Sequence, residues 1–291
     1  MTTPSDFQLI CAPVTAFAAD GSLDIDGTRA LFAALRAAGV DGVFTPGTTG
    51  EFTALDDDER LAIIEAALEV FGQQGVVAHV GAASARQAVR LARAAHAAGA
   101  TRFAAITPYF MPAGAISVRD YYAALADALP GASLYVYLFA SRAVTTVNPA
   151  ELATLAELPG VVGVKVSGLS LAENLAYLTA APEGFEYYSG SDADIVRLAA
   201  AGASGIVSGI STLFPETFVS AARAIRAGAD ASVFQSDIDA AAAAASGAGI
   251  GLMKTGLAQR GLAIADTVRV AIEPPTPDRL AALRDTVERL R

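Results

Sequence analysis

Lysine is scarce in this sequence of 291 residues, and so are the residues of metal and disulfide chemistry. Only two of its 20 lysine and arginine side chains are lysines, Lys165 and Lys254. The chain has a single cysteine, Cys11, and two histidines, His79 and His96. One cysteine cannot form an internal disulfide, and no cysteine or histidine spacing matches a metal site. We therefore expect neither a disulfide framework nor a metal centre.

Long apolar runs are also missing. No stretch of eighteen apolar residues occurs, and the first residues lack the basic and apolar regions of a signal peptide. The sequence thus predicts no membrane span and a cytoplasmic location. A net charge of −10 disfavours nucleic acid and anionic membrane surfaces as partners. The hydrophobic content of 53% is enough for a large core.

Short β-rich runs alternate with amphipathic helical patterns along most of the chain. The helical patterns begin at Asp or Ser and end at Gly, as helices commonly do. Such alternation predicts parallel strands, and eight units fit a closed (β/α)8 TIM barrel of the α/β class. A doubly wound open sheet is the alternative, but no G-x-G-x-x-G follows the first strand. The eight strand candidates are FQLICAPVT, DGVFTPG, VVAHVG, RFAAITP, SLYVYLF, VVGVKVSG, FEYYSG and GIVSGIS.

More helical sequence follows the eighth strand than a barrel requires. We predict a barrel over residues 1–225 and a C-terminal helical extension, packed on the barrel, over residues 226–291. In such barrels the chemistry lies at the C-terminal ends of the strands. We therefore expect the functional residues at the C-terminal ends of the eight strands.

Lys165 stands in the middle of the apolar run VVGVKVSG, an unusual place for a cation. Strand alternation puts it on the barrel-facing side with Gly163 and Ser167. A dry setting favours the neutral form of an amine, which can attack a ketone carbonyl and form a Schiff base. The alternative is a structural lysine–carboxylate pair, for which the next strand offers only Glu186. The opposite face would carry Val162, Val164 and Val166.

Two further features end neighbouring strands. Tyr137 precedes Lys165 by one βα unit, so the two are predicted neighbours, and a phenol there could shuttle protons. The loop GTTGEF, residues 47–52, could gather backbone N–H groups into a nest for a carboxylate, with hydroxyls from Thr48 and Thr49. The alternatives are a core tyrosine and a tight turn.

These motifs occur together in an order that resembles a known family. GTTGE follows strand two, TPYF follows strand four, a tyrosine and SR follow strand five, and VGVK lies in strand six. The chain is similar to the dihydrodipicolinate synthase / N-acetylneuraminate lyase superfamily of Schiff-base-forming barrel enzymes, from about Leu9 to the C-terminal RGLAIADTVRVAIEPPTP.

The resemblance implies roles for individual residues. Lys165 would form the imine with pyruvate or another 2-oxo acid, Tyr137 would transfer protons, and Thr48 would join the relay. Thr48 and Thr49 would hold the substrate carboxylate. The imine would serve as the electron sink, so no cofactor and no metal are expected, and the family usually forms tetramers built as dimers of dimers. The other implied substrate-binding positions are Gly47, Tyr109, Phe110, Arg142, Gly190 and Val207.

Some positions depart from the family's best-known member. Dihydrodipicolinate synthases typically read TPYYN, and their second tyrosine reaches across the dimer; Phe110 stands there in this chain and has no hydroxyl. Leu138, Ala140 and Val144 also differ from the strand-five motif. The half that forms the imine is intact, whereas the half that selects the second substrate has changed. We therefore predict a class I aldolase or dehydratase, a lyase acting on pyruvate or a 2-keto-3-deoxy sugar acid.

Several alternatives stay open. The chain could be a 4-hydroxy-tetrahydrodipicolinate synthase that condenses pyruvate with aspartate semialdehyde, or a non-catalytic sugar-acid-binding barrel. A third alternative is a phosphate-handling isomerase, which would need a basic residue near strands seven and eight to bind the phosphate; only Arg197 is close to them in the sequence. Arg142 could pair structurally with Asp192 or Asp194 instead of binding substrate. Lys254, in a helical pattern, is predicted to be a solvated or helix-covering lysine, with a subunit contact as the alternative.

Overall fold

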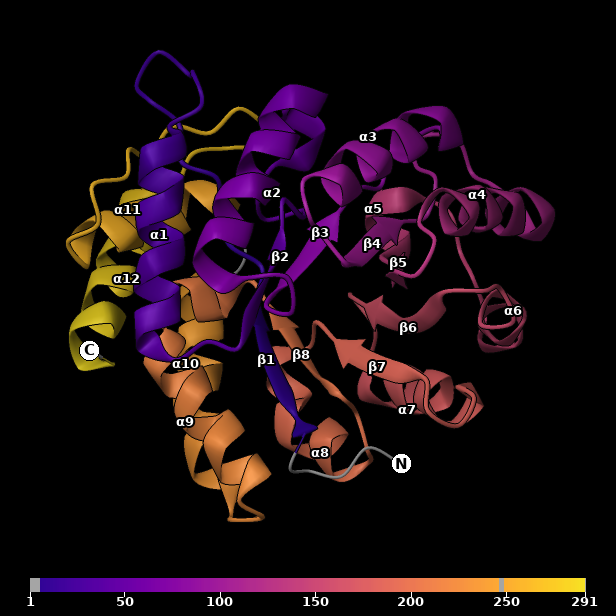
Figure 1. Ribbon diagram of the computed structural model, residues 1–291. Helices are drawn as coiled ribbons and strands as arrows, with labels where there is room; N and C mark the ends of the chain where they lie inside the picture. Colours follow the sequence, from indigo (N-terminus) through magenta and orange to yellow (C-terminus); the bar gives the residue numbers. More distant parts are fainter. Residues whose placement is uncertain (1–5, 246–248, 291) are drawn as a thin grey trace.

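The computed structural model describes residues 6–245 and 249–290 and contains a closed parallel barrel. The strands follow one another around it in chain order, and β1 closes the barrel by pairing with β8 (Figure 1). All eight predicted strands are confirmed. They are β1 Gln8–Cys11, β2 Gly42–Thr45, β3 Val76–His79, β4 Arg102–Ile106, β5 Ser133–Leu138, β6 Val161–Val166, β7 Glu186–Ser189 and β8 Gly205–Ser208.

Helices surround the barrel, and several begin with side-chain caps that the sequence supplies. Asp56 and Glu59 form a capping box at the start of α2, and Ser170 and Glu173 form another at α7. The helices that follow the strands are α1 Ile25–Ala38, α2 Asp57–Phe71, α3 Ala85–Ala97, α4 Ala115–Ala128, α5 Ala140–Ala143, α6 Pro149–Leu155, α7 Leu171–Ala180, α8 Ile195–Ala200 and α9 Pro215–Arg226.

Three more helices form the predicted C-terminal extension, α10 Gln235–Ala245, α11 Gly249–Gln259 and α12 Pro277–Arg289. Figure 1 shows them gathered on the side of the barrel that carries α1 and α9. Their buried residues belong to one hydrophobic cluster with those of α1, α2 and α9. The division of the chain at residue 225 stays a prediction, and residues 1–5, 246–248 and 291 lie outside the described residues.

Strand alternation separates an inner core from an outer one. On β1, Ile10 belongs to the cluster inside the barrel, whereas Leu9 and Cys11 pack outward against helices. The inner cluster also contains Phe44, Tyr137 and Val207. Among the helices of the described residues, none has both the length and the apolar character needed to cross a bilayer.

The alternation predicted for β6 is wrong at one residue. The pairing with β5 shifts between Leu134 and Tyr135, so Val161 takes the place opposite Leu134 and Gly163 the place opposite Tyr135. Val161 therefore packs among the outer residues, while Val162 contacts the inner cluster. The irregularity adds one residue before Gly163, and beyond it Val164 and Val166 face outward as predicted.

Candidate active site

Lys165 points into the barrel from β6, where its side chain meets aromatic rings. Its neighbours in register are Tyr137 on β5 and Tyr188 on β7, which confirms the predicted pairing of Lys165 with Tyr137. The residue is 7% exposed, and its Nζ lies 3.7 Å from the centroid of the Tyr137 ring and 5.3 Å from that of Phe44. The amine thus sits over π-electron faces that attract a cation.

No carboxylate lies within 4 Å of Lys165 Nζ among residues 6–245 and 249–290. Glu186, the alternative partner, is held at the other end of the barrel, where it accepts hydrogen bonds from Tyr188 at 2.7 Å and Tyr135 at 3.0 Å. Arg102 joins that group. The structural lysine–carboxylate pair considered for Lys165 is therefore not formed.

Gly163, two residues before Lys165, is required by close packing. A Cβ atom there would lie 2.6 Å from the Glu186 carbonyl oxygen and 2.8 Å from the Tyr135 ring. These distances are too short for any side chain, so only glycine fits beneath the lysine.

Tyr137 is buried and hydrogen-bonded to the loop after β2. Its hydroxyl lies 3.0 Å from Thr48 Oγ1, and its ring packs edge-on against Phe44 and His79. A phenol hydroxyl that is hydrogen-bonded to a second hydroxyl can pass a proton along the pair.

The loop itself, residues 47–52, is fixed by short-range hydrogen bonds. The Phe52 N–H donates to the Gly47 carbonyl oxygen at 3.2 Å, and the Thr15 hydroxyl donates to that of Gly50 at 2.7 Å. A Cβ at Gly209, after β8, would lie 3.0 Å from Thr49 Oγ1. The loop therefore extends from β2 toward the end of β8, on the same side as Tyr137.

His79 is a buried, neutral support beneath this group. Burial, together with the neighbouring Arg60 guanidinium, holds the pKa of His79 well below its usual value. Its Nδ1 donates to the Pro46 carbonyl oxygen at 2.9 Å, and Nε2 accepts from the Ile106 N–H at 3.3 Å. Both ring nitrogens are thus engaged by backbone, which fits a structural histidine.

Asp192 is a second ionisable group whose charge interacts with that of Lys165. Its Oδ1 is buried and has no hydrogen-bond partner among the described residues. Burial raises the pKa of the Asp192 carboxyl to about 7, although the Ser208 hydroxyl and the Lys165 ammonium act in the opposite direction. Asp192 was considered only as a partner of Arg142 from sequence, and its proximity to Lys165 was missed.

The remaining predicted positions lie around this centre. Gly190 approaches Ser167 so closely that a Cβ would lie 2.6 Å from its hydroxyl oxygen, and Val207 lines the inner wall. Tyr109 is half-buried, with its ring edge-on to Phe52 at 5.6 Å.

Two predicted residues lie farther out. The Phe110 side chain is 85% exposed, with a φ of 75°. Arg142 is exposed and lies over the Phe139 ring, 6.0 Å from its centroid. The structural pairing considered for Arg142 is absent from the described residues, because Asp194 binds Arg197 instead and no ion pair joins Arg142 to Asp192. Its contact with substrate stays a prediction.

The prediction for Lys254 is wrong. The residue is neither solvated nor at the surface but fully buried, with Nζ 2.7 Å from Glu51 Oε1. Helical periodicity could not indicate this, because the partner lies 203 residues away in the chain.

Comparisons with known proteins agree with this geometry. The model of the dihydrodipicolinate synthetase family matches residues 7–290. The chain is 32% identical to the 4-hydroxy-tetrahydrodipicolinate synthase of Mycolicibacterium paratuberculosis, over 94% of this chain and 92% of that one. It is 35% identical to 4-hydroxy-tetrahydrodipicolinate synthase 1 of Streptomyces coelicolor, over 78% of this chain and 75% of that one.

Solved structures of similar proteins share the barrel fold of this chain. YagE, a prophage protein of the dihydrodipicolinic acid synthase family from E. coli K12 whose structure contains pyruvate, superposes with a TM-score of 0.90 at 27% identity, covering 98% of both chains. The sialic acid aldolase of Ruminococcus gnavus shares the fold, with a TM-score of 0.89 at 21% identity over 99% of this chain and 97% of that one.

Proposed function

The chain belongs to the dihydrodipicolinate synthetase family and is a lyase of that family, and on this premise we propose that it works through an imine between Lys165 and pyruvate or a 2-keto-3-deoxy sugar acid. The observation that carries the proposal is a buried amine with no carboxylate within 4 Å in the described residues, packed on a tyrosine that is hydrogen-bonded to Thr48. A buried lysine so placed suits nucleophilic catalysis.

In the proposed reaction Lys165 Nζ gives up a proton and attacks the C2 carbonyl carbon of the oxo acid. The carbinolamine loses water and leaves the imine, which withdraws electrons from C3. Breaking the C3–C4 bond of a longer substrate releases an aldehyde as the C4 hydroxyl loses its proton, and leaves an enamine; removing a C3 proton from pyruvate gives the same enamine. Protonation of the enamine at C3 and hydrolysis of the imine then release pyruvate and free Lys165. Tyr137, hydrogen-bonded to Thr48, carries the proton to and from the substrate. In a dehydratase the same imine would acidify C3 so that a hydroxyl leaves from C4.

We assign the substrate carboxylate to Thr48, Thr49 and the backbone beginning at Gly47, because hydroxyl and N–H donors gather in that loop. Gly190 and Val207 would border the oxo acid. Tyr109 and the exposed Phe110 and Arg142 would meet the second substrate. The imine supplies the electron sink, so the proposed chemistry uses neither a cofactor nor a metal.

Condensation of pyruvate with aspartate semialdehyde is the second candidate reaction. The names of the M. paratuberculosis and S. coelicolor relatives favour it. The exposed Phe110 side chain has no hydroxyl and argues for a different second substrate. A coupled assay with aspartate semialdehyde, set against a panel of 2-keto-3-deoxy sugar acids, would separate the two reactions.

We also propose a homotetramer, a dimer of dimers, located in the cytoplasm. The apolar side chains of Phe110, Met111 and Ile116, which follow β4, are strongly exposed, and such surfaces are often covered by another subunit. The free, buried Cys11 thiol suits a reducing compartment. Light scattering coupled to gel filtration should give four times the chain mass.

The test of the imine is reductive trapping. The protein is incubated with pyruvate, reduced with borohydride and digested, and the modified lysine is located by mass spectrometry. We expect the adduct on Lys165, with Lys254 as the internal control because it is the only other lysine. No adduct with pyruvate or with longer 2-oxo acids would overturn the mechanism and leave a non-catalytic sugar-acid-binding barrel.

A further inference from the structure

A buried ion pair joins the loop of the candidate active site to the C-terminal extension. Glu51 lies in this loop, and Lys254 lies on α11; neither side chain is accessible to solvent. Lys254 Nζ donates to Glu51 Oε1 at 2.7 Å and to the Thr267 carbonyl oxygen at 2.6 Å. It also lies 4.3 Å from the centroid of the Phe17 ring. The ammonium group thus has two oxygen acceptors and an aromatic ring as its neighbours, and it is shielded from solvent.

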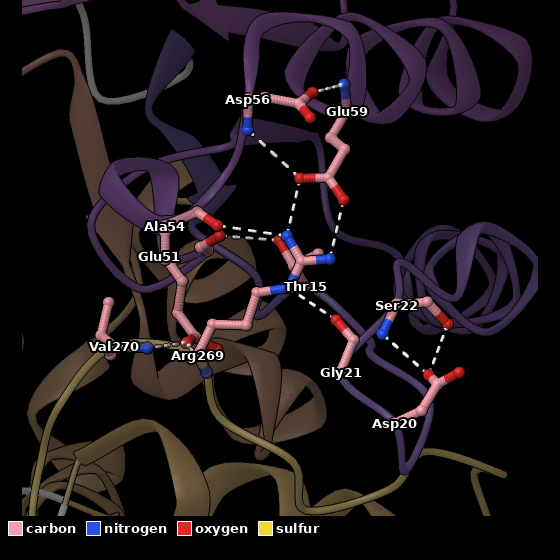
Figure 2. Close-up of polar contacts among 11 residues, drawn as sticks. Thr15, Asp20, Gly21, Ser22, Glu51, Ala54, Asp56, Glu59, Arg269 and Val270 are labelled. Atoms are coloured by element: carbon pink, nitrogen blue, oxygen red, sulfur yellow. Dashed lines mark hydrogen bonds and ion pairs between the residues drawn. The ribbon is translucent and has the colours of Figure 1, made fainter.

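The second oxygen of Glu51 binds backbone. Oε2 accepts hydrogen bonds from the N–H groups of Arg269 at 2.7 Å and Val270 at 3.0 Å, as Figure 2 shows. Glu51 adopts a φ of 58°, a left-handed conformation that strains most residues other than glycine by about 1–3 kcal/mol. A residue held there despite this strain suggests that its side chain is needed.

Arg269 contacts the same region from outside. Its guanidinium donates to the carbonyl oxygens of Gly21 at 2.7 Å and Ala54 at 3.1 Å, and it forms two hydrogen bonds with the Glu59 carboxylate at 2.6 and 2.7 Å (Figure 2). Ala54 and Glu59 follow the loop directly in the chain. The segment around residue 269 is therefore bound both to the loop and to the residues after it.

A single turn connects this contact to the proposed proton relay. The Glu51 N–H donates to the Thr48 carbonyl oxygen at 3.1 Å, and Thr48 Oγ1 lies 3.0 Å from the Tyr137 hydroxyl. A shift of Glu51 would consequently move Thr48 relative to Tyr137. Misplacing a catalytic group by about 1 Å can slow a reaction on the order of 10²-fold.

We propose that Glu51 is a positioning residue, through which the C-terminal extension holds Thr48 against Tyr137. Its carboxylate binds Lys254 and the backbone of Arg269 and Val270, and so fixes the loop conformation from outside the barrel. The effect on catalysis rests on the proposed function; the effect on the loop does not.

The loop is tested first by amide hydrogen exchange, which needs no substrate. In Glu51→Gln we expect faster exchange in peptides covering residues 47–53, and unchanged exchange in the peptide covering β6. Arg269→Ala should show the same pattern more weakly. The Arg269 side chain is partly exposed, so its loss threatens folding less than the loss of the Glu51 carboxylate. Exchange equal to wild type at residues 47–53 in both variants would overturn the proposal.

Asp41→Asn is the matched control. Asp41 also accepts a backbone N–H, that of Leu9 at 2.8 Å, and pairs with Arg226 at 2.7 Å, but it lies at the opposite end of the barrel. This variant should lower stability without changing exchange at residues 47–53. If the loss of any carboxylate loosened the whole protein, amide exchange at residues 47–53 would instead be faster in both Glu51→Gln and Asp41→Asn.

The link to catalysis is tested with pyruvate in D2O. Enamine formation there replaces the methyl hydrogens of pyruvate by deuterium, and NMR measures the rate of this exchange. Glu51→Gln should slow this exchange about 10-fold, Arg269→Ala about 3-fold, and Asp41→Asn less than about 2-fold. In a Thr48→Val background, Glu51→Gln should add about 2-fold or less, because the residue it positions has lost its hydroxyl. Equal slowing in both backgrounds would overturn the positioning role.

The two proposals fail separately. If the wild-type protein forms no Lys165 adduct and exchanges no methyl hydrogens, the proposed function is wrong, and the role of Glu51 in holding the loop is then decided by amide exchange alone. If wild type instead forms the adduct, and Glu51→Gln shows the same rates of amide hydrogen exchange and of pyruvate methyl exchange as wild type, only the positioning role of Glu51 is wrong.

Discussion

The two lysines of this chain are both buried, and their surroundings are opposite. Lys254 has Glu51 at 2.7 Å and a carbonyl oxygen at 2.6 Å. Lys165 has aromatic rings beside it and, in the part of the chain that the structure describes, no carboxylate within 4 Å. One lysine is paired as a buried cation ordinarily must be, and the other is not.

The difference supports the proposal that Lys254 serves structure and Lys165 serves chemistry. Burial lowers the pKa of Lys254, while its hydrogen bond to Glu51 acts in the opposite direction and favours the charged form. An ammonium fixed by three neighbours cannot become a nucleophile. Lys165 has no such partner, so its amine is available to a carbonyl that enters the barrel.

Replacing Lys165 by Met should have the largest effect. Because no ion pair is lost, we expect the fold to persist, while exchange of pyruvate methyl hydrogens falls by at least about 10⁴-fold. NMR in D2O measures the rate, and urea unfolding checks the fold. Residual exchange above about 1% of wild type would contradict the role of Lys165.

Replacing Lys254 by Met should instead act on stability. The change leaves the Glu51 carboxylate buried without its cation, so the free energy of unfolding should fall by about 3–5 kcal/mol. Chemical denaturation measures it, and the pyruvate adduct should still form on Lys165. The companion variant Lys254→Met/Glu51→Gln should recover part of the loss. A Lys254→Met protein as stable as wild type would remove the distinction between the lysines.

Tyr137→Phe should separate imine formation from proton transfer. The ring that packs beside Lys165 remains and only the hydroxyl bound to Thr48 is lost. We expect borohydride to trap the adduct still, while methyl exchange slows about 10²–10³-fold. Equal losses in trapping and exchange would mean that the hydroxyl also serves imine formation.

Asp192 gives the surroundings of Lys165 a pH dependence. Its folded-state pKa of about 7 exceeds that of an unfolded Asp, so the folded state binds more protons between about pH 4 and pH 7. The stability of wild type relative to Asp192→Asn should therefore fall by about 4 kcal/mol as the pH rises through this range, and level off above it. Urea unfolding of both proteins at pH 4 to 8 measures this, and a constant difference would contradict the shifted pKa.

Arg142→Ala should have the smallest effect. The side chain is exposed and lies over the Phe139 ring. Trapping of pyruvate should be unchanged, and the KM of a second substrate with a terminal carboxylate should rise about 2- to 5-fold. Steady-state assays compare this substrate with an analogue that lacks the carboxylate, for which no rise is expected.

What the sequence predicted depends on local periodicity. The eight strands and the pairing of Tyr137 with Lys165 follow from alternation and from the length of a βα unit, which are properties of neighbouring residues. The shift at Val162 was not predictable in this way, because an irregularity is decided by how two strands pair.

The contacts that were missed join distant parts of the chain. Glu51 and Lys254 meet only when the C-terminal extension packs beside the loop, and Asp192 comes near Lys165 only when β6 and β7 are neighbours. Helical periodicity describes the face of α11 but not what covers it. Residue chemistry pointed to Lys165 as the candidate nucleophile, whereas tertiary packing determined the surroundings of Lys254.

Burial of both lysines also determines how the protein meets amine-directed reagents. Among the described residues every exposed basic side chain is an arginine, since Lys254 is 0% exposed and Lys165 is 7% exposed. Lysine crosslinkers and enzymes that modify lysine therefore find no lysine side chain on the outer surface. An amine-reactive molecule small enough to enter the barrel would label Lys165 alone among the side chains, and so turn a general reagent into a probe of the candidate active site.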